Sequence, residues 1–406
     1  MGQLAKPRVA VVSPFIDRSH GTELLVAEWM NCLADKFEIH LYSQSVRDID
    51  PQKFVWHRIP TLPGPHLFNY CWWFVANQFW RAFDRHVRGL RYDLVYSPGI
   101  NCFDADVISV HVVFAEYTKR NAANLRLSRR PLREWPALLH RKLYYRLIMF
   151  LERRIYPDQT RTLVLIARKS SQELARCYGR NDSPNVIYVG IDHQKFNTQR
   201  RLGLRAAARQ ELGLAQDSFA LILVGNDWRS KGLPVLLEAL SQLKNQRIHL
   251  LLVSRENPEP IRAIVQSREL EECVHILPPR KDIEFYYAAA DAYVGPSLED
   301  SYALPPAEAM ACGLPVIVSS ANGTSEIISP SVDGLILENP ADAPALAHMI
   351  RRLFEDAAFR AELGENAART AQQYTWERAG QQMNAIFEQV LRRKGRIAAE
   401  TLARDF

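Results

Sequence analysis

The chain has 406 residues, enough for two domains of ordinary size, and its 47% hydrophobic and 24% charged residues exclude a disordered chain. Its six cysteines are scattered and form neither a CxxC pair nor a metal-ligand spacing, which favours reduced thiols. The net charge of +6 is uneven, because residues 118–162 carry +9 and the rest of the chain −3. This excess of cations indicates an anionic partner for that segment.

Short β-branched runs alternate with longer amphipathic stretches, the pattern of parallel βαβ units. In the first half, the predicted strands are Arg8–Pro14, Phe37–Ser43, Leu94–Ser97, Val107–His111, Thr162–Ala167 and Val186–Val189. In the second half, they are Ala220–Gly225, His249–Ser254, Val274–Leu277, Ala292–Gly295, Pro315–Ser319 and Gly334–Leu337. Helices are predicted at Thr22–Ala34, Leu233–Leu243, Asp282–Ala290 and, last, from Thr375 to about Lys394. We therefore expect an α/β fold with two doubly wound, Rossmann-like sheets in succession.

The N-terminal residues show no signal-peptide pattern, and the stretch Leu67–Trp80 is too short and too polar to span a bilayer. A soluble or peripheral protein is expected. Neither half contains G-x-G-x-x-G, so a nicotinamide-dependent dehydrogenase is not indicated.

Two segments of the second half carry candidate chemistry. Gly225–Leu233 (GNDWRSKGL) joins a predicted strand to a helix, and its Arg229 and Lys231 suit a diphosphate near a helix N-terminus. Pro296–Val318 (PSLEDSYALPPAEAMACGLPVIV) reads as loop, short helix and strand, with Asp300 and Glu308 eight residues apart. Two such carboxylates can face one ligand. The alternatives are a solvated loop, and acids that only cap or complement a helix.

Together these segments resemble the donor site of retaining GT-B glycosyltransferases of the large family 4. The sequence Glu308–Ile317 (EAMACGLPVI) matches the family's signature, and Asp300 replaces the first Glu of its Glu-x7-Glu pair. Asn226 stands where the family has Arg, so Arg229 is expected to act with Lys231. The loop 225–232 looks most like that of the lipopolysaccharide-core glucosyltransferases. Later Gly-x-x-Glu and Asp-Gly elements, at Gly323–Glu326 and Asp333–Gly334, also resemble the family.

The resemblance extends into the first half. His20-Gly21-Thr22-Glu23 is similar to the family's Gly-Gly-x-Glu loop, with Gly21 the expected contact. His111, at the end of a predicted strand, matches a position at which relatives place a polar residue near the transferred sugar. A lone His at a strand end also has purely structural roles, and both interpretations remain open.

The resemblance implies two domains: an N-terminal acceptor-binding domain over 1–190 with the returning helix 378–406, and a donor-binding domain over 191–377. It assigns catalytic roles to Arg229, Lys231, Asp300 and His111. It assigns donor binding to Gly21, Tyr302, Ala303, Leu304, Glu308 and Glu326. It also implies retention of anomeric configuration, a UDP-linked hexose donor, and no metal or other cofactor, because cations and helix dipoles neutralise the diphosphate.

The basic segment 118–162 interleaves its cations with large apolar residues, which suits an anionic membrane or a phosphorylated glycolipid acceptor. A core helix with a solvated basic face is the alternative, and nucleic acid is disfavoured because no recognition motif accompanies the charge. The leading hypothesis is a transferase at the cytoplasmic face of the membrane, acting on a lipid-linked or lipopolysaccharide acceptor. A GT-B enzyme making a small glycoside, a non-catalytic sugar-nucleotide-binding protein and a sugar-nucleotide epimerase are the other interpretations.

Overall fold

The computed structural model describes residues 6–18, 21–120, 122, 125 and 131–396. The chain divides into two compact units: unit 1 is Met1–Tyr188 with Trp376–Phe406, and unit 2 is Val189–Thr375. These bounds lie two residues before the boundaries 190/191 and 377/378 that the sequence suggested. Among the described residues, no helix combines the length and the apolar character that crossing a bilayer requires.

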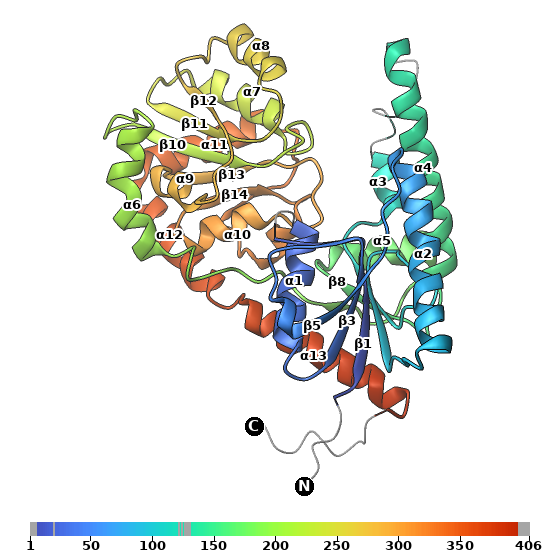
Figure 1. Cartoon of the computed structure of the whole chain (residues 1–406). Helices are drawn as coiled ribbons and strands as arrows, with labels where there is room; N and C mark the ends of the chain where they lie inside the picture. Colours follow the sequence, from blue (N-terminus) through green and yellow to red (C-terminus); the bar gives the residue numbers. More distant parts are fainter. Residues whose placement is uncertain (1–5, 19–20, 121, 123–124, 126–130, 397–406) are drawn as a thin grey trace. The chain divides into compact units, whose positions relative to one another are not determined.

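Unit 1 is built on a seven-stranded parallel sheet with the order β5-β3-β1-β6-β7-β8-β9 (Figure 1). Its strands are β1 (Arg8–Val12), β3 (Glu38–Ser43), β5 (Phe54–Arg58), β6 (Leu94–Pro98), β7 (Val107–Val110), β8 (Thr162–Leu165) and β9 (Asn185–Val186). The short strands β2 (Phe15–Ile16) and β4 (Ser45–Val46) pair separately. Strand β5 was not predicted. It lies at the sheet edge and leaves Val55 and Trp56 exposed, and its apolar run is only three residues long.

Helices cover both faces of this sheet. They are α1 (Gly21–Leu33), η1 (Pro51–Lys53), α2 (His66–Val87), α3 (Phe114–Arg120), η3 (Leu132–Glu134), α4 (Trp135–Ile155), α5 (Lys169–Tyr178) and α13 (Trp376–Arg393). On one face, Ala10 and Val12 of β1 share a core with Trp73 of α2 and Leu151 of α4. On the other face, the ring of Tyr96 contacts those of Trp29 in α1 and Phe387 in α13. The last helix therefore completes unit 1, although it follows unit 2 in the chain.

Unit 2 contains a six-stranded parallel sheet with the order β12-β11-β10-β13-β14-β15. Its strands are β10 (Phe219–Val224), β11 (Ile248–Val253), β12 (Val274–Leu277), β13 (Ala292–Gly295), β14 (Val316–Ser319) and β15 (Leu335–Leu337). Its helices are α6 (Thr198–Glu211), α7 (Leu233–Leu243), α8 (Glu259–Ser267), α9 (Glu284–Ala289), α10 (Leu304–Ala311), η4 (Gly323–Ile327), α11 (Ala343–Glu355) and α12 (Ala357–Ala371). The strands predicted for this half are present, with ends shifted by one residue at most.

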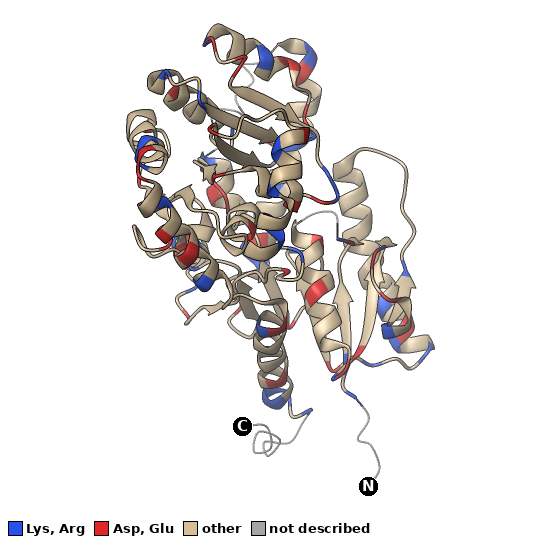
Figure 2. Cartoon of the chain, turned by 90° about the vertical axis from the view of Figure 1, so that its left-hand side faces the viewer, with Lys and Arg blue, Asp and Glu red and all other residues tan. Residues whose placement is uncertain are grey.

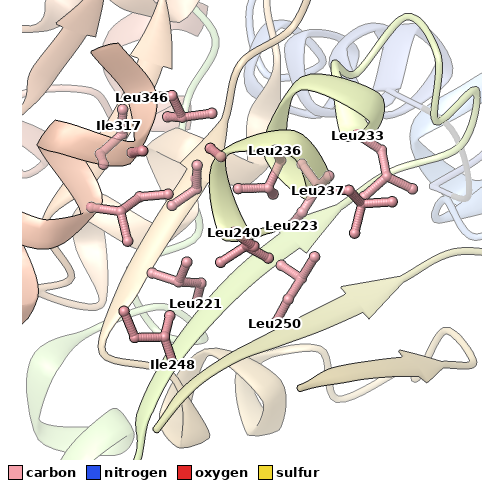
Figure 3. Close-up of a cluster of buried hydrophobic side chains, with 14 of the residues drawn as sticks. Leu221, Leu223, Leu233, Leu236, Leu237, Leu240, Ile248, Leu250, Ile317 and Leu346 are labelled. Carbon is pink, nitrogen blue, oxygen red and sulfur yellow. The ribbon is translucent and has the colours of Figure 1, made fainter. Parts of the chain in front are cut away.

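Leucine-rich packing of α7 against the sheet forms the core of unit 2. Figure 3 shows Leu236, Leu237 and Leu240 of α7 above Leu221 and Leu250 of the sheet, and all five are buried. Burial of each such side chain contributes about 1.5–3 kcal/mol. This packing holds α7, and with it the loop between β10 and α7, in a fixed position over the sheet.

Each sheet reverses its strand order once. In unit 2, β13 returns to pair with β10 after the chain has built β11 and β12 on the other side. In unit 1, β6 returns to pair with β1 in the same way. Ligands of doubly wound sheets bind beyond the carboxyl ends of the strands at such a reversal. The fold therefore offers one candidate site in each unit.

Candidate functional site

The predicted donor-site residues of unit 2 come from loops at the carboxyl ends of three neighbouring strands. Residues 225–232 follow β10, residues 296–303 follow β13, and residues 320–327 follow β14. The first two loops flank the reversal of strand order. The site is thus placed where the topology of the sheet favours ligand binding.

The loop after β10 is anchored at its centre by Trp228, which is only 4% exposed and belongs to the core of the unit. The carboxylate of Glu256 accepts hydrogen bonds from the backbone N–H groups of Asp227 (2.9 Å) and Trp228 (3.4 Å). Asp227 has a φ of 56°, a left-handed conformation that Asp tolerates better than most residues. Because the Trp228 indole is buried and the turn is held by Glu256, the backbone positions of Arg229 and Lys231 are fixed.

Asn226 ties this loop to its neighbour. Its Oδ1 atom accepts hydrogen bonds from the backbone N–H of Arg255 (3.0 Å) and from the hydroxyl of Ser254 (3.2 Å), both after β11. Arg229 is exposed, and its guanidinium forms no ion pair within the described part of the chain. The family pattern has an Arg at the position of Asn226, three residues before Arg229. In this chain the Asn226 side chain is hydrogen-bonded to the loop after β11 and does not replace that Arg, whereas Arg229 is accessible to an anion.

Gly232 brings the loops after β10 and β13 into direct contact. Its φ is 78°, and a Cβ atom placed on it would lie 1.9 Å from the carbonyl oxygen of Pro296. Beside it, Leu298 donates its N–H to the carbonyl of Ser230 (2.7 Å), and the Ser230 hydroxyl donates to the carbonyl of Glu299 (3.3 Å). The sequence pair Lys231-Gly232 thus needs glycine for close backbone approach as well as for its conformation.

We expect Gly232→Ala to destabilise unit 2 well beyond the cost of a left-handed alanine. Gly213→Ala is the matched control, because Gly213 has a φ of 66° and a Cβ atom placed on it would meet nothing within 4 Å. The control should lose about 1–2 kcal/mol of unfolding free energy, and Gly232→Ala about 1–3 kcal/mol more from the clash. Urea unfolding followed by tryptophan fluorescence measures both values. Equal losses would contradict the contact between the loops.

Lys231 and Asp300 form an ion pair across the two loops. Their side chains are 24% and 13% exposed, so the pair is largely screened from solvent. Asp300 is itself fixed by its backbone, which donates to the carbonyl of Ala321 (3.2 Å) and accepts from the N–H of Gly323 (3.0 Å). Spacing alone selected Asp300 over Glu299, and Asp300 is the acid that contacts Lys231.

Glu308 lies in α10, the short helix after the β13 loop. Pro305 and Pro306 occupy its first turn, and Gly313 follows its end with a φ of 72°, as the sequence suggested. The Tyr287 hydroxyl, on α9, donates a hydrogen bond to Oε2 of Glu308 (2.8 Å). Burial raises the pKa of Glu308 to about 7. A ligand that brings hydroxyl donors to this carboxyl would stabilise its charged form.

Asn322 and Thr324, which the sequence analysis did not single out, organise the N-terminal side of α10. The Thr324 hydroxyl donates to the carbonyl of Ala303 (2.6 Å) and accepts from its N–H (3.1 Å). The Asn322 side chain caps η4 by accepting from the N–H of Thr324 (3.0 Å). The pair Asn322-Gly323 is a pattern typical of turns and helix caps, and it could have indicated this role from the sequence. These bonds place Tyr302, Ala303 and Leu304 beside η4, which contains Glu326.

The two remaining predicted residues belong to unit 1. Gly21 begins α1, and His111 follows β7 directly, where it lines a cavity of about 390 Å³. The Ser109 hydroxyl lies 3.0 Å from Nε2 of His111. Burial lowers the pKa of His111 to about 4, so the imidazole is neutral at pH 7. His20 lies outside the described residues.

The structure thus brings Arg229, Lys231, Asp300 and Glu308 into one unit, with Tyr302, Ala303, Leu304 and Glu326 on the same set of loops. Gly21 and His111 lie in the other unit. Within the described part of the chain, no group of three or more His, Cys, Asp or Glu residues is arranged to hold a metal ion. Chemically, the unit 2 site offers cations for an anion and carboxyls for hydroxyl groups.

Comparison with known proteins agrees with this arrangement. Residues 205–370 match the family described as glycosyl transferases group 1, and they form a domain of that family. The match spans α7, α10 and the three loops of the site. The motif Glu308–Ile317 lies within the matched residues, and for residues 205–370 the expected family is confirmed.

Among curated relatives, a D-inositol 3-phosphate glycosyltransferase of Xylanimonas cellulosilytica is 29% identical over 246 residues, which cover 57% of this chain and 58% of that protein. A protein of the same description from Pseudarthrobacter chlorophenolicus is 32% identical over 226 residues, 53% of each chain. The chain thus spans little more than half the length of these relatives.

Solved structures share the fold over nearly the whole chain. WaaG, a glycosyltransferase involved in lipopolysaccharide biosynthesis, superposes with a TM-score of 0.76 at 19% identity, covering 93% of this chain and 99% of that one. Anabaena HepE in complex with UDP-glucose gives a TM-score of 0.70 at 19% identity, covering 94% and 99%. The predicted GT-B fold, with two Rossmann-like domains, is confirmed.

Proposed function

We propose that the chain is a retaining glycosyltransferase that moves a hexose from a UDP-sugar to a lipid-linked or lipopolysaccharide acceptor at the cytoplasmic face of the membrane. The observation that carries the proposal is the junction of the loops after β10 and β13, which places Lys231 against Asp300 beside the exposed Arg229. The group 1 family match over this unit supports the transferase class. HepE, of the same fold, binds UDP-glucose, which supports the choice of donor.

In this proposal, Arg229 and Lys231 bind the diphosphate next to the N-terminus of α7. Asp300 holds the ammonium of Lys231 in position and contacts the transferred sugar, while Glu308 accepts hydrogen bonds from the ribose hydroxyls. The backbone of Tyr302, Ala303 and Leu304 and the side chain of Glu326 line the same donor site. Gly21 and His111, which belong to unit 1, keep the donor-binding and catalytic roles that the family resemblance implies. Negative charge grows on the diphosphate as the glycosidic bond breaks, and the two cations stabilise it without a metal ion.

A thermal-shift panel of UDP-, GDP- and ADP-glucose tests the donor. A ligand at a hundred times its Kd adds about 2.7 kcal/mol of stability, which corresponds to roughly 5–10 °C in the Tm of a domain of this size. We expect that shift for UDP-glucose, together with slow hydrolysis of the donor. No shift with any sugar nucleotide would overturn the proposal, and binding without hydrolysis or transfer would favour a non-catalytic partner.

The membrane part of the proposal draws on two helices of unit 1 that leave apolar side chains in solvent. On α2, Phe68, Val75, Phe79 and Phe83 are exposed at intervals of seven, four and four residues, a stripe along one face. On α4, Leu139, Leu143 and Phe150 form a second stripe, which also contains the exposed Arg146 and Arg153. Aromatic and aliphatic side chains beside cations suit the interface of an anionic bilayer.

The two helices lie side by side (Figure 1), since the Leu67 N–H donates to His140 Nε2 (3.2 Å) and Tyr70 and Tyr144 stack edge to face. In the view of Figure 2, by contrast, basic and acidic residues are interspersed along the helices of unit 2. Of the cations that the sequence analysis grouped in 118–162, Arg126, Arg129 and Arg130 lie outside the described residues. The proposed membrane surface is therefore formed by α2 and α4.

We expect Arg146→Glu with Arg153→Glu to abolish sedimentation with vesicles of phosphatidylglycerol and phosphatidylcholine. Each cation near an anionic surface contributes about 1 kcal/mol, so the double reversal should weaken binding by a factor of 30 or more. The control is Arg262→Glu with Arg351→Glu, which makes the same change of charge on exposed helices of unit 2. Unchanged sedimentation of the unit 1 variant, or equal loss in both, would contradict a surface formed by α4.

A further inference from the structure

The cavity of unit 1 lies at the reversal of its sheet. It has a volume of about 390 Å³, within the range of small-molecule sites. Its walls come from the loops after β1 (Ser13–Phe15), after β6 (Gly99–Asn101) and after β7 (His111, Val112), and from α2 and α4. This is the position at which a doubly wound sheet binds a ligand.

The described residues that line the cavity include neither Lys nor Arg. They include two acids, Glu23 and Glu152, and two histidines, His66 and His111. Burial lowers the pKa of both imidazoles, that of His111 to about 4. Glu152 is fully buried and already accepts hydrogen bonds from the N–H groups of Phe114 (2.8 Å) and Ala115 (3.3 Å). A phosphate entering this cavity would find no cation among these described lining residues to compensate the loss of its hydration.

Aromatic rings form much of the wall. Tyr70, Trp73 and Tyr144 line it, and the ring of Tyr144 lies edge to face with those of Tyr70 and His66. The face of an aromatic ring is electron-rich, so it attracts the weakly positive C–H groups of a sugar ring.

Two polar atoms of the wall have no hydrogen-bond partner among the described residues. They are Nε2 of Gln44, a side chain only 6% exposed, and Oδ1 of Asn69. One is a donor and the other an acceptor, and leaving both unpaired in a buried position costs about 1–3 kcal/mol each. A ligand hydroxyl, which both donates and accepts, satisfies either atom.

We propose that this cavity binds an uncharged saccharide ring of the acceptor, stacked on Tyr144 and hydrogen-bonded to Gln44 and Asn69, and that it rejects a phosphorylated ring. The inference rests on the proposed transferase function and specifies its acceptor. It separates this chain from the relatives described as D-inositol 3-phosphate glycosyltransferases, whose named acceptor carries a phosphate. Anionic groups elsewhere on a lipid-linked acceptor would then meet the cations of α4 outside the cavity.

Saturation-transfer-difference NMR on the full chain, without donor, tests this inference. The probes are methyl α-glucoside, methyl β-galactoside and methyl α-mannoside, each compared with glucose 6-phosphate and D-inositol 3-phosphate. We expect at least one neutral glycoside to bind about tenfold more tightly than either phosphate. Tyr144→Ala and Gln44→Leu should each remove that signal, whereas Tyr144→Phe keeps the ring and should retain it. Asn69→Lys should shift the preference toward the phosphates.

Equal or tighter binding of the phosphates, no signal from any neutral glycoside, or a signal that survives both Tyr144→Ala and Gln44→Leu would overturn the inference. The thermal shift with UDP-glucose serves as the independent control. If that shift is retained while the neutral glycosides fail, the acceptor assignment is wrong and the donor assignment stands. If the shift is absent, the transferase proposal itself fails.

Discussion

Replacing Lys231 with alanine should lower kcat for sugar transfer by about 10²–10³-fold, the effect of removing one preorganised charge from a transition state. The donor KM should change less, because the negative charge on the diphosphate is completed only as the bond to the sugar breaks. Arg229→Ala should show a smaller loss, since its side chain is exposed and screened by water. Initial rates at varied donor concentration separate the two parameters.

A double-mutant cycle distinguishes catalysis from folding. Because Lys231 and Asp300 form an ion pair, Asp300→Ala should lower kcat by a smaller factor in the Lys231→Ala background than in the wild type. Arg262→Ala is the control, a cation of the same unit in an exposed pair with Glu259. Additive losses at Lys231 and Asp300, or a comparable loss in the control, would contradict a joint role in the site.

Glu308→Gln should move stability and donor binding in opposite directions. The pKa of Glu308 in the folded chain, about 7, lies above its ordinary value of 4.5. The folded state therefore binds the proton of Glu308 more tightly than the unfolded state does. The contribution of Glu308 to the free energy of unfolding is largest below pH 4.5 and is lost as the pH rises through 7. Glutamine carries no charge, so at pH 8 the variant should be more stable by about 3 kcal/mol, and at pH 4 it should match the wild type.

The same change should weaken donor binding at pH 8. A carboxylate accepts hydrogen bonds from ribose hydroxyls more strongly than an amide does, and losing charge-assisted bonds costs about 1.5–3 kcal/mol. We expect the donor KM to rise about 10–100-fold. Urea unfolding at both pH values and donor titration measure the two effects. Glu362→Gln, on the exposed face of α12, is the control, and a destabilised Glu308→Gln at pH 8 would refute the assigned pKa.

The sequence predicted most strands of both sheets because parallel strands buried on both faces read as continuous apolar runs. It also predicted α7, whose ends at Leu233 and Leu243 are those expected. It missed β5, a five-residue strand at the sheet edge in which only Phe54 to Trp56 are apolar and Val55 and Trp56 are exposed. Periodicity alone does not distinguish such a strand from a loop.

For the site, sequence reasoning identified Lys231, Asp300 and Glu308 because their spacing around a strand, loop and helix is recognisable. It did not find Tyr287 or Thr324, which hold Glu308 and Ala303 from other elements through side-chain hydrogen bonds. Such partners have no fixed distance in the chain, so only the fold reveals them. Two unit 1 atoms without a partner among the described residues, Nε2 of Gln44 and Oδ1 of Asn69, were hidden for the same reason.

The position of α13 has a consequence for how the chain acquires its structure during synthesis. Phe387 of this helix packs on Phe37 and Tyr96, and a Cβ on Gly380 would lie 2.4 Å from that of Cys32, so the helix sits tightly on α1. All residues of unit 2 have been synthesised once Thr375 is added. At that point α13, which covers the hydrophobic face of α1, has not yet been synthesised. Unit 2 can therefore mature on the nascent chain, and unit 1, begun first, is finished last.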